Sequence, residues 1–251
     1  ATIAIWNAAR RHNCHPKRSP APQLPNTAIT LGSNATAVAP SRSSDGSTLL
    51  MINSHQPLTG PVSWYEVHLQ SGDGLTVMGG LFIGSAALGV GFNEHHGWGA
   101  TVNQPDLVDV YVLEMDPEDD NRYRVDGEWL ELESFDIPIK VLLWGWLPWT
   151  VKEKGYRSIH GPVMKTDHGT YALRYAGMDE IRQVEQWLAM SAATSFEEWR
   201  EAMALQHIAS FNFVYANTDG DIHFVHNAMM PRRAVGWQWD QYLPGNRRDL
   251  I

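Results

Sequence analysis

The stretch that decides the fold reads Leu31-Gly32-Ser33-Asn34-Ala35-Thr36-Ala37-Val38, and the character of the chain changes across it. Residues 1–32 contain a basic, proline-rich tract that is typical of a spacer and is poorly able to bury a core. From residue 33 onward the chain reads as strands, beginning at 35–38 and 48–52 on either side of a Ser-Asp-Gly turn. We therefore predict a spacer over 1–32 and a strand-rich domain over 33–251.

Further short strands are expected along the chain, at 64–69, 75–78, 90–93, 99–102 and 108–114. Two hairpins are expected around Asp126-Gly127 and Asp219-Gly220, because these dipeptides favour tight turns. The second hairpin joins strands at 213–216 and 222–226.

Helical patterns occur only late in the chain, over 179–190 and 195–206. The second pattern opens with Ser195-x-x-Glu198, which is typical of a capping box. The segment 141–149 is so rich in apolar and aromatic residues that we expect a strand edge or a pocket wall rather than surface.

Composition excludes several classes of function. The 251 residues are 43% hydrophobic and 19% charged, as in packed globular proteins. The net charge of −9 argues against a general nucleic-acid binder, which needs a basic surface to neutralise phosphates. The single cysteine, Cys14, excludes an intramolecular disulfide and a cysteine metal cluster. The most apolar stretch, 78–92, contains five glycines and is shorter than the roughly 20 residues of a membrane span.

Each candidate reactive residue has an ordinary explanation when it is considered alone. Ser33 could belong to a turn before a strand, and His55 could be a hydrogen-bonded loop histidine. Asn212 could satisfy a neighbouring backbone group, and Arg233 could be a surface charge or half of an ion pair. The sequence Glu94-His95-His96 suggests a second enzyme class, a metal-dependent amidohydrolase, although adjacent histidines on a strand point to opposite faces.

Several motifs occur together in one order, and in combination they resemble the penicillin acylase family. They are Gly32-Ser33-Asn34, Asn53-Ser54-His55, Gly97-Trp98-Gly99-Ala100-Thr101-Val102-Asn103, Asp106-Leu107-Val108-Asp109, His160-Gly161-Pro162-Val163, Asn212-x-x-Tyr215-Ala216-x-x-x-Gly220-x-Ile222, Pro231-x-Arg233 and Tyr242-Leu243-Pro244-Gly245. The resemblance runs from about residue 30 to the last residue. It is nearest to the branch that contains the acyl-homoserine lactone and cephalosporin acylases.

This resemblance implies an α+β fold, the αββα sandwich of the N-terminal nucleophile hydrolases, in incomplete form. It implies that a precursor cuts itself between Gly32 and Ser33, and that Ser33 then attacks the amide substrate. The α-amine that is freed has a reference pKa of roughly 7.7–8.0, low enough to accept the hydroxyl proton near neutral pH. No separate base and no cofactor are then required.

The remaining site residues are also implied by the resemblance. His55 corresponds to a histidine that orients the nucleophile, and the Val102 backbone N–H and the Asn212 side chain correspond to the oxyanion hole. Arg233 corresponds to an arginine that supports Asn212 or meets the substrate. Two carboxylates, from Asp106 and Asp109, and the Val108 carbonyl correspond to part of a structural calcium site.

The resemblance implies partners and a location as well. An α subunit and the remainder of the β subunit would come from the same precursor, and family members are exported to the periplasm. The implied substrates are acyl amides, such as N-acyl-homoserine lactones or β-lactam side chains. Thr36 departs from the family pattern, in which an aromatic residue is frequent. If residue 32 stays joined to Ser33, no free α-amine exists, so a third interpretation is an inactive fragment or binding module.

Overall fold

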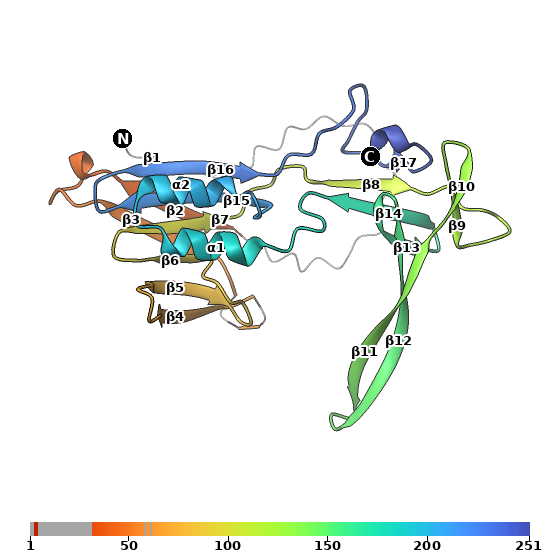
Figure 1. The fold of residues 1–251 in the computed structure, drawn as a ribbon, viewed down its shortest axis with the longest axis horizontal. Coiled ribbons are helices and arrows are strands. Elements are labelled where there is room, and N and C mark those ends of the chain that lie inside the picture. The colour runs from red at the N-terminus through yellow and green to blue at the C-terminus, as the bar shows by residue number, and fades with distance from the viewer. Residues whose placement is uncertain (1–2, 5–31, 58, 61) are drawn as a thin grey trace. The chain divides into compact units, whose positions relative to one another are not determined.

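The computed structural model describes residues 3–4, 32–57, 59–60 and 62–251, and the chain forms two compact units (Figure 1). Unit 1 consists of Ala1–Pro105 and Asp179–Met229. Unit 2 consists of Asp106–Met178 and Met230–Ile251. The sequence indicated no boundary after residue 32, so this division is a new finding. Apart from residues 3–4 and 32, the predicted spacer lies outside the described residues.

Unit 1 contains two antiparallel sheets. The larger sheet has the strand order β16-β15-β7-β6-β5-β4, and the smaller has the order β1-β2-β3. Their bounds are β1 (Ile3–Ala4), β2 (Ser33–Val38), β3 (Leu49–Ser54), β4 (Trp64–Gln70), β5 (Thr76–Phe82), β6 (Val90–Phe92), β7 (His96–Thr101), β15 (Ser210–Asn217) and β16 (Ile222–Ala228). A 3-10 helix, η1 (Pro40–Arg42), follows β2. The strands predicted in this unit are confirmed, with ends shifted by a few residues.

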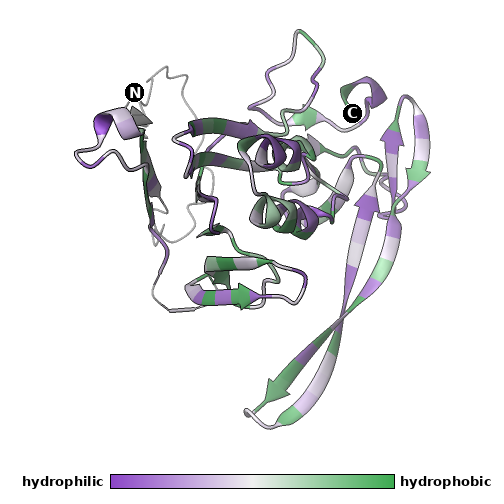
Figure 2. Ribbon diagram, turned by 60° about the vertical axis from the view of Figure 1, so that its left-hand side comes forward, coloured by the Kyte–Doolittle hydropathy of each residue, from purple (hydrophilic) through white to green (hydrophobic). Residues whose placement is uncertain are grey.

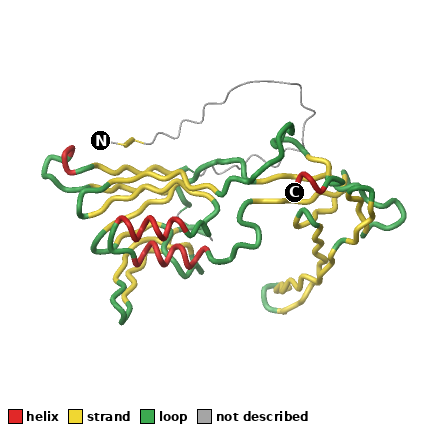
Figure 3. The backbone as a smooth tube through the Cα atoms, turned by 45° about the horizontal axis from the view of Figure 1, so that its top comes forward, coloured by secondary structure: helices red, strands yellow, loops and turns green. Residues whose placement is uncertain are grey.

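Two helices, α1 (Gln183–Ala192) and α2 (Phe196–Ala204), belong to unit 1 (Figure 3). The Glu198 backbone N–H donates to Ser195 Oγ over 3.2 Å, which confirms the predicted start of the second helix. The first helix begins later than predicted. Asp179 has a φ of 70°, a left-handed conformation that cannot continue a right-handed helix.

The alternation of side chains along β15 shows how unit 1 is layered. Phe213 and Tyr215 point to one face and pack with Met190 and Trp199 of the helices. Val214 and Ala216 point to the other face and pack with alanines of β2. Unit 1 is therefore a helix layer, a six-stranded sheet and a small sheet, which are three layers of an αββα sandwich.

Two glycines of β7 allow the small sheet to approach closely. A Cβ atom on Gly97 would lie 2.9 Å from Leu50 Cδ2, and one on Gly99 would lie 2.6 Å from Ile52 Cγ1. From the first contact to the second, both strands advance by two residues. Ser54 follows Ile52 by two residues and Thr101 follows Gly99 by two, so Ser54 comes toward Thr101 at the end of β7.

Unit 2 contains a six-stranded sheet of order β11-β12-β13-β14-β8-β17 and a two-stranded sheet of β9 and β10. The bounds are β8 (Val108–Val112), β9 (Arg122–Val125), β10 (Glu128–Glu131), β11 (Glu133–Leu143), β12 (Leu147–Ser158), β13 (Gly161–Thr166), β14 (Gly169–Tyr175) and β17 (Leu243–Pro244), with a 3-10 helix η2 (Arg248–Leu250). The predicted hairpin around Asp126-Gly127 is confirmed, with φ values of 49° and 88° at these two residues. A separate core forms around Tyr111 and Tyr123.

The segment 141–149 forms the tip of the β11–β12 hairpin. Trp144 is 80% exposed and Trp146 is 71% exposed, so the expectation that this segment avoids the surface is wrong. The expectation of a strand edge is confirmed, because β11 is the outer strand of its sheet. Figure 2 shows apolar colouring toward the tip of this hairpin. The hairpin turns at Trp144-Gly145, where both φ values are positive.

Candidate active site

Ser33 is the first residue of β2 and pairs with Ser54 of β3. Its Oγ donates a hydrogen bond of 2.5 Å to the Gly32 carbonyl oxygen. The His55 backbone N–H donates to the same oxygen over 3.0 Å. The carbonyl that precedes the serine therefore accepts two hydrogen bonds, one from the predicted nucleophile and one from the backbone.

The His55 ring lies beside this peptide. Its Nε2 contacts the side-chain nitrogens of Asn34 and Asn53 at 3.4 Å and 3.3 Å. Both amide groups can donate, so Nε2 is the acceptor atom of the ring in this arrangement. A Cβ atom on Gly32 would lie 3.2 Å from His55 Nδ1, so a larger residue before the serine would crowd the ring.

Asn212 lies on β15 opposite Thr101, the last residue of β7. Its Nδ2 donates to Thr101 Oγ1 over 3.3 Å and lies 3.5 Å from the Val102 carbonyl oxygen. The residue is 7% exposed. The two residues predicted to form an oxyanion hole, Val102 and Asn212, are thus brought together at the end of β7.

The oxygen of the Asn212 side-chain amide also has a hydrogen-bond partner. His226 of β16 pairs with Asn212 across the two strands, and its Nδ1 lies 2.8 Å from Asn212 Oδ1. The oxygen can only accept, so the histidine nitrogen donates. The amide is therefore held at both ends.

Ser33 and Val102 line one cavity of about 280 Å³. Its other lining residues are mainly apolar and aromatic, and they are Ser54, Gln56, Trp64, Phe82, Ser85, Ala87, Gly89, Ala100, Gln183, Val184, Trp187 and Phe211. Trp64 and Phe82 are stacked, with ring centroids 4.3 Å apart. A cavity with apolar walls beside a nucleophile is the environment that an acyl group requires.

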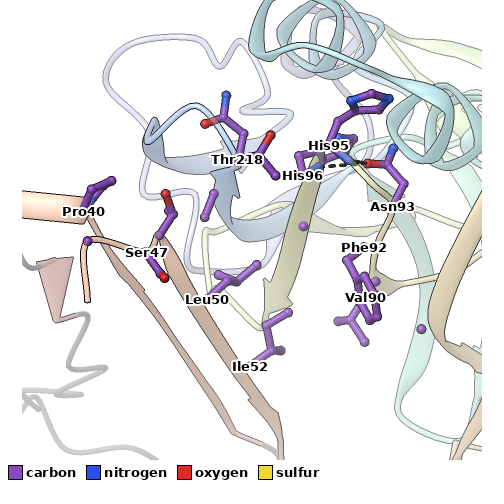
Figure 4. A pocket seen from close by; sticks show the side chains of 17 residues that line it. Pro40, Ser47, Leu50, Ile52, Val90, Phe92, Asn93, His95, His96 and Thr218 are labelled. Carbon is purple, nitrogen blue, oxygen red and sulfur yellow. Dashed lines mark hydrogen bonds between the residues drawn. The ribbon is translucent and has the colours of Figure 1, made fainter. Parts of the chain in front are cut away.

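A larger cavity, of about 640 Å³, lies elsewhere in unit 1. Figure 4 shows its apolar side chains from β3 and β6, among them Leu50, Ile52 and Phe92. None of the predicted reactive residues Ser33, His55, Val102 and Asn212 lines it. We place the candidate site at the smaller cavity because Ser33 and Val102 line it.

Arg233 belongs to unit 2, where its guanidinium binds two carboxylates. The distances are 2.8 Å from Nη2 to Asp109 Oδ1 and 2.9 Å from Nη1 to Asp106 Oδ2. Partial burial opposes the charge of Arg233, but the hydrogen bonds that the guanidinium donates to Asp109 and Asp106 outweigh it and raise its pKa. The ordinary explanation, an ion pair, therefore describes Arg233 in this unit, and its predicted role beside Asn212 stays a prediction.

The predicted calcium ligands are Asp106, Val108 and Asp109. Carboxylates and a carbonyl suit calcium chemically, but the ion takes about six to eight oxygen ligands. Among the described residues, no group of three or more His, Cys, Asp or Glu side chains is arranged to hold a metal. Arg233 already supplies positive charge to both carboxylates. The described residues do not form a complete calcium site.

The sequence Glu94-His95-His96 does not gather metal ligands in unit 1. His96 is 3% exposed and its Nε2 lies 3.1 Å from the Met190 carbonyl oxygen. Burial lowers the pKa of His96 to about 4, although this bond opposes the shift. His95 is exposed and lies in the bend before β7, which begins at His96. This separation argues against the metal-dependent alternative.

Two other motifs that were quoted for the resemblance meet inside unit 2. His160 is completely buried, and its Nε2 lies 2.9 Å from the Gly245 carbonyl oxygen. The His160 ring also stacks on Tyr111, with centroids 4.3 Å apart. Burial lowers the pKa of His160, although the hydrogen bond to Gly245 opposes this shift. These motifs hold the core of unit 2 together.

Sequence reasoning missed the residues that position the site. Asn34, Asn53, Thr101 and His226 all contact a predicted site residue. Two of them had a readable signal. Asn53 lies two residues before His55, and side chains two residues apart in an extended chain point the same way. His226 lies opposite Asn212 in the hairpin that Asp219-Gly220 already predicted.

Ser33 is the first residue of a strand in the small sheet, and the larger sheet and the helix layer lie behind that sheet. This arrangement defines the class of protein. Unit 1 has the α+β fold of the N-terminal nucleophile hydrolases. The thermostable penicillin G acylase from Alcaligenes faecalis has a similar structure, with a TM-score of 0.71 and 24% sequence identity over 84% of this chain and 38% of that chain. The family model for penicillin amidase matches residues 3–249, and the chain belongs to this family.

Named relatives agree with this assignment. Two acyl-homoserine lactone acylases called PvdQ, from two strains of Pseudomonas fluorescens, are 30% and 31% identical to the chain over 92% and 81% of its length. Penicillin G acylase from Escherichia coli is 26% identical over 84% of the chain. The chain spans 30%, 27% and 26% of the lengths of these three relatives. In the described part of the chain, no helix is long and apolar enough to cross a membrane.

Proposed function

We propose that the full-length protein containing this chain hydrolyses the amide bond between an acyl group and an amine, through an acyl-enzyme on Ser33. One observation carries the proposal. Ser33 and Val102 line the same apolar cavity, and the Asn212 amide nitrogen lies 3.5 Å from the Val102 carbonyl oxygen, just beyond the end of β7. Nucleophile, oxyanion donors and acyl pocket are the three parts that acyl transfer needs.

The first step of the proposal is self-cleavage. Ser33 Oγ attacks the Gly32 carbonyl carbon, the bond from that carbon to the Ser33 nitrogen breaks, and the nitrogen takes the hydroxyl proton. Water then hydrolyses the resulting ester and leaves Ser33 with a free α-amine. The hydrogen bond from Ser33 Oγ to the Gly32 oxygen and the one from the His55 N–H to that oxygen support this step. The backbone donor would stabilise the negative charge that develops there.

Turnover uses the new amine as base. The α-amine of Ser33 accepts the hydroxyl proton as Oγ attacks the substrate carbonyl, and the oxyanion forms between the Val102 N–H and Asn212 Nδ2. The amine product leaves with the proton, and water then releases the carboxylic acid. His55 orients the serine. Loss of one oxyanion donor typically reduces kcat by about 10²–10³.

The acyl group is proposed to be apolar. Trp64, Phe82, Trp187 and Phe211 supply aromatic walls to the cavity beside Ser33. Relatives of this chain are named for cleaving acyl-homoserine lactones and penicillin G. We therefore propose N-acyl-homoserine lactones or β-lactam side chains as substrates.

The proposal includes partners and a compartment. An α subunit and the rest of the β subunit, cut from the same precursor, would complete the acyl pocket, and the mature enzyme would work in the periplasm. Uncovered apolar residues of β3, such as Met51 with 57% exposure, are consistent with further chain packing on the small sheet. The chemistry requires no cofactor and involves neither nucleic acid nor a membrane span.

A labelling experiment tests the proposed function. The purified full-length protein is incubated with phenylmethylsulfonyl fluoride, and its peptides are analysed by mass spectrometry alongside turnover of acyl-homoserine lactones and penicillin G. We expect modification of Ser33 and loss of amide hydrolysis. An active protein labelled elsewhere, or an active protein that carries no label and is inhibited by a metal chelator, would contradict the serine mechanism. No turnover and no label would support an inactive binding module instead.

A further inference from the structure

We propose that His226 is a positioning residue that sets the direction of the oxyanion donor Asn212; the inference rests on the proposed function. It starts from the 2.8 Å contact between His226 Nδ1 and Asn212 Oδ1.

The backbone holds the two residues in register. β15 and β16 form a hairpin in which Asn212 pairs with His226 and Ala216 pairs with Ile222. Ile222 and Phe224 pack on the face toward the small sheet. Period-two alternation puts His226 on that same face, which is also the face of Asn212. The ring therefore reaches Asn212 from the neighbouring strand without a change in backbone geometry.

The hydrogen bond from His226 determines whether the nitrogen or the oxygen of the Asn212 amide faces the reacting atoms. The terminal torsion of asparagine is broad and roughly two-fold, so the torsion itself does not distinguish nitrogen from oxygen and neighbouring groups must do so. A ring N–H that donates to Oδ1 removes this freedom. Asn212 Nδ2 is then directed toward Thr101 Oγ1 and the Val102 carbonyl, at the end of β7. An exchanged amide would present an acceptor to the oxyanion, and the two oxygens would repel.

The alternative is that His226 is simply a solvated histidine on an edge strand. β16 is the outer strand of its sheet and His226 is exposed, so burial alone gives it no structural importance. If this alternative holds, replacing the ring will change neither kcat nor the amide direction. The two interpretations therefore differ in kinetics rather than in stability.

The test compares His226→Leu and His226→Asn in the full-length protein, with penicillin G or a medium-chain acyl-homoserine lactone as the substrate. His226→Leu should reduce kcat about tenfold, with KM and melting temperature nearly unchanged, because one orienting hydrogen bond is lost. His226→Asn should restore most of kcat, because its Nδ2 is as far along the side chain as the histidine Nδ1. The matched control is His223→Leu, on the same strand but facing the helices, which should keep wild-type kcat.

A double-mutant cycle completes the test. In an Asn212→Ala background, His226→Leu should cause no further loss of kcat, because the histidine acts only through the amide. An active wild type with an equally active His226→Leu variant would overturn the inference alone. Full additivity with Asn212→Ala would also overturn it. A wild type that hydrolyses neither substrate would overturn the proposed function, and the inference with it.

Discussion

Ile52 of β3 lies directly against Gly99 of β7, at a point where a Cβ atom would come within 2.6 Å of Ile52 Cγ1. Gly97 stands in the same relation to Leu50. These contacts set the separation of the two sheets. Ser33 is paired with Ser54, two residues beyond Ile52, so the sheet separation determines how far the serine lies from the end of β7.

Replacing Gly99 should therefore disturb both packing and activity. Gly99→Ala adds a methyl group where Ile52 leaves no space, and we expect a loss of about 1–3 kcal/mol in the free energy of unfolding. Self-cleavage and turnover should both slow as the sheets separate. Chemical denaturation measures the first effect and gel analysis of precursor processing the second. Gly72→Ala is the control, because nothing lies within 4 Å of a Cβ atom at that position; equal behaviour of the two variants would contradict the account.

Removing Arg233 should destabilise unit 2. Asp109 has a side-chain exposure of 5% and would be left without its bidentate partner in Arg233→Ala. Breaking a buried ion pair by deleting one partner costs about 3–5 kcal/mol. Arg233→Lys should recover only part of this loss, because lysine cannot bind two carboxylates in the same planar way. Thermal unfolding measures both variants. A melting temperature that falls on addition of chelator to the wild type would instead support calcium at Asp106 and Asp109.

The buried His96 should make stability depend on pH. Burial lowers its pKa from 6.5 to about 4, so between these values the ring is neutral in the folded protein and protonated in the unfolded chain. The unfolded state binds more protons in this range, so the free energy of unfolding falls as the pH drops below 6.5. Above pH 6.5 the ring is neutral in both states, so the protonation of His96 no longer lowers the free energy of unfolding. Comparing unfolding midpoints at neutral pH and about pH 5, we expect a smaller difference in His96→Gln than in the wild type. An unchanged difference would rule out His96 as a source.

The sequence predicted the fold where the signals are local. Turn dipeptides such as Asp126-Gly127 need positive φ values, and the capping pair Ser195 and Glu198 marks the start of a helix. The segment 141–149 was misjudged because hydrophobicity alone does not say which neighbours are available to cover a strand. Trp144 is exposed although its large apolar side chain suggests burial.

The site was predictable only in part. A family motif indicates Ser33, His55, Val102 and Asn212, but the partners that orient them come from neighbouring strands. The pairing of residues in a hairpin can be counted outward from its turn, and this count identifies His226 as the partner of Asn212. The pairing of Asn212 with Thr101 joins strands more than a hundred residues apart, and no local pattern encodes it. Long-range register depends on the packing of the whole sheet.

Trp64 should limit the size of the acyl group. Its ring stacks on Phe82 and lies close to Gly89, where a Cβ atom would come 2.9 Å from Trp64 Cη2. Trp64→Ala should enlarge the cavity and shift the preference toward longer acyl chains, by about tenfold in the ratio of kcat/KM for long and short substrates. Tyr65→Ala is the control, because Tyr65 is 60% exposed and does not line the cavity. A Trp64→Ala variant with wild-type chain-length preference would place the acyl group elsewhere.

The identity of Ser33 as a nucleophile that activates itself is tested most directly at its own amino terminus. The wild-type full-length protein and its Ser33→Ala variant are expressed in parallel, and the N-termini of all polypeptides are determined by sequencing and intact mass. We expect one wild-type polypeptide to begin at Ser33, and we expect the variant to remain uncut at Gly32 and to hydrolyse no amide. A Ser33→Ala protein that is still cut between residues 32 and 33, or that still turns over substrate, would contradict the account.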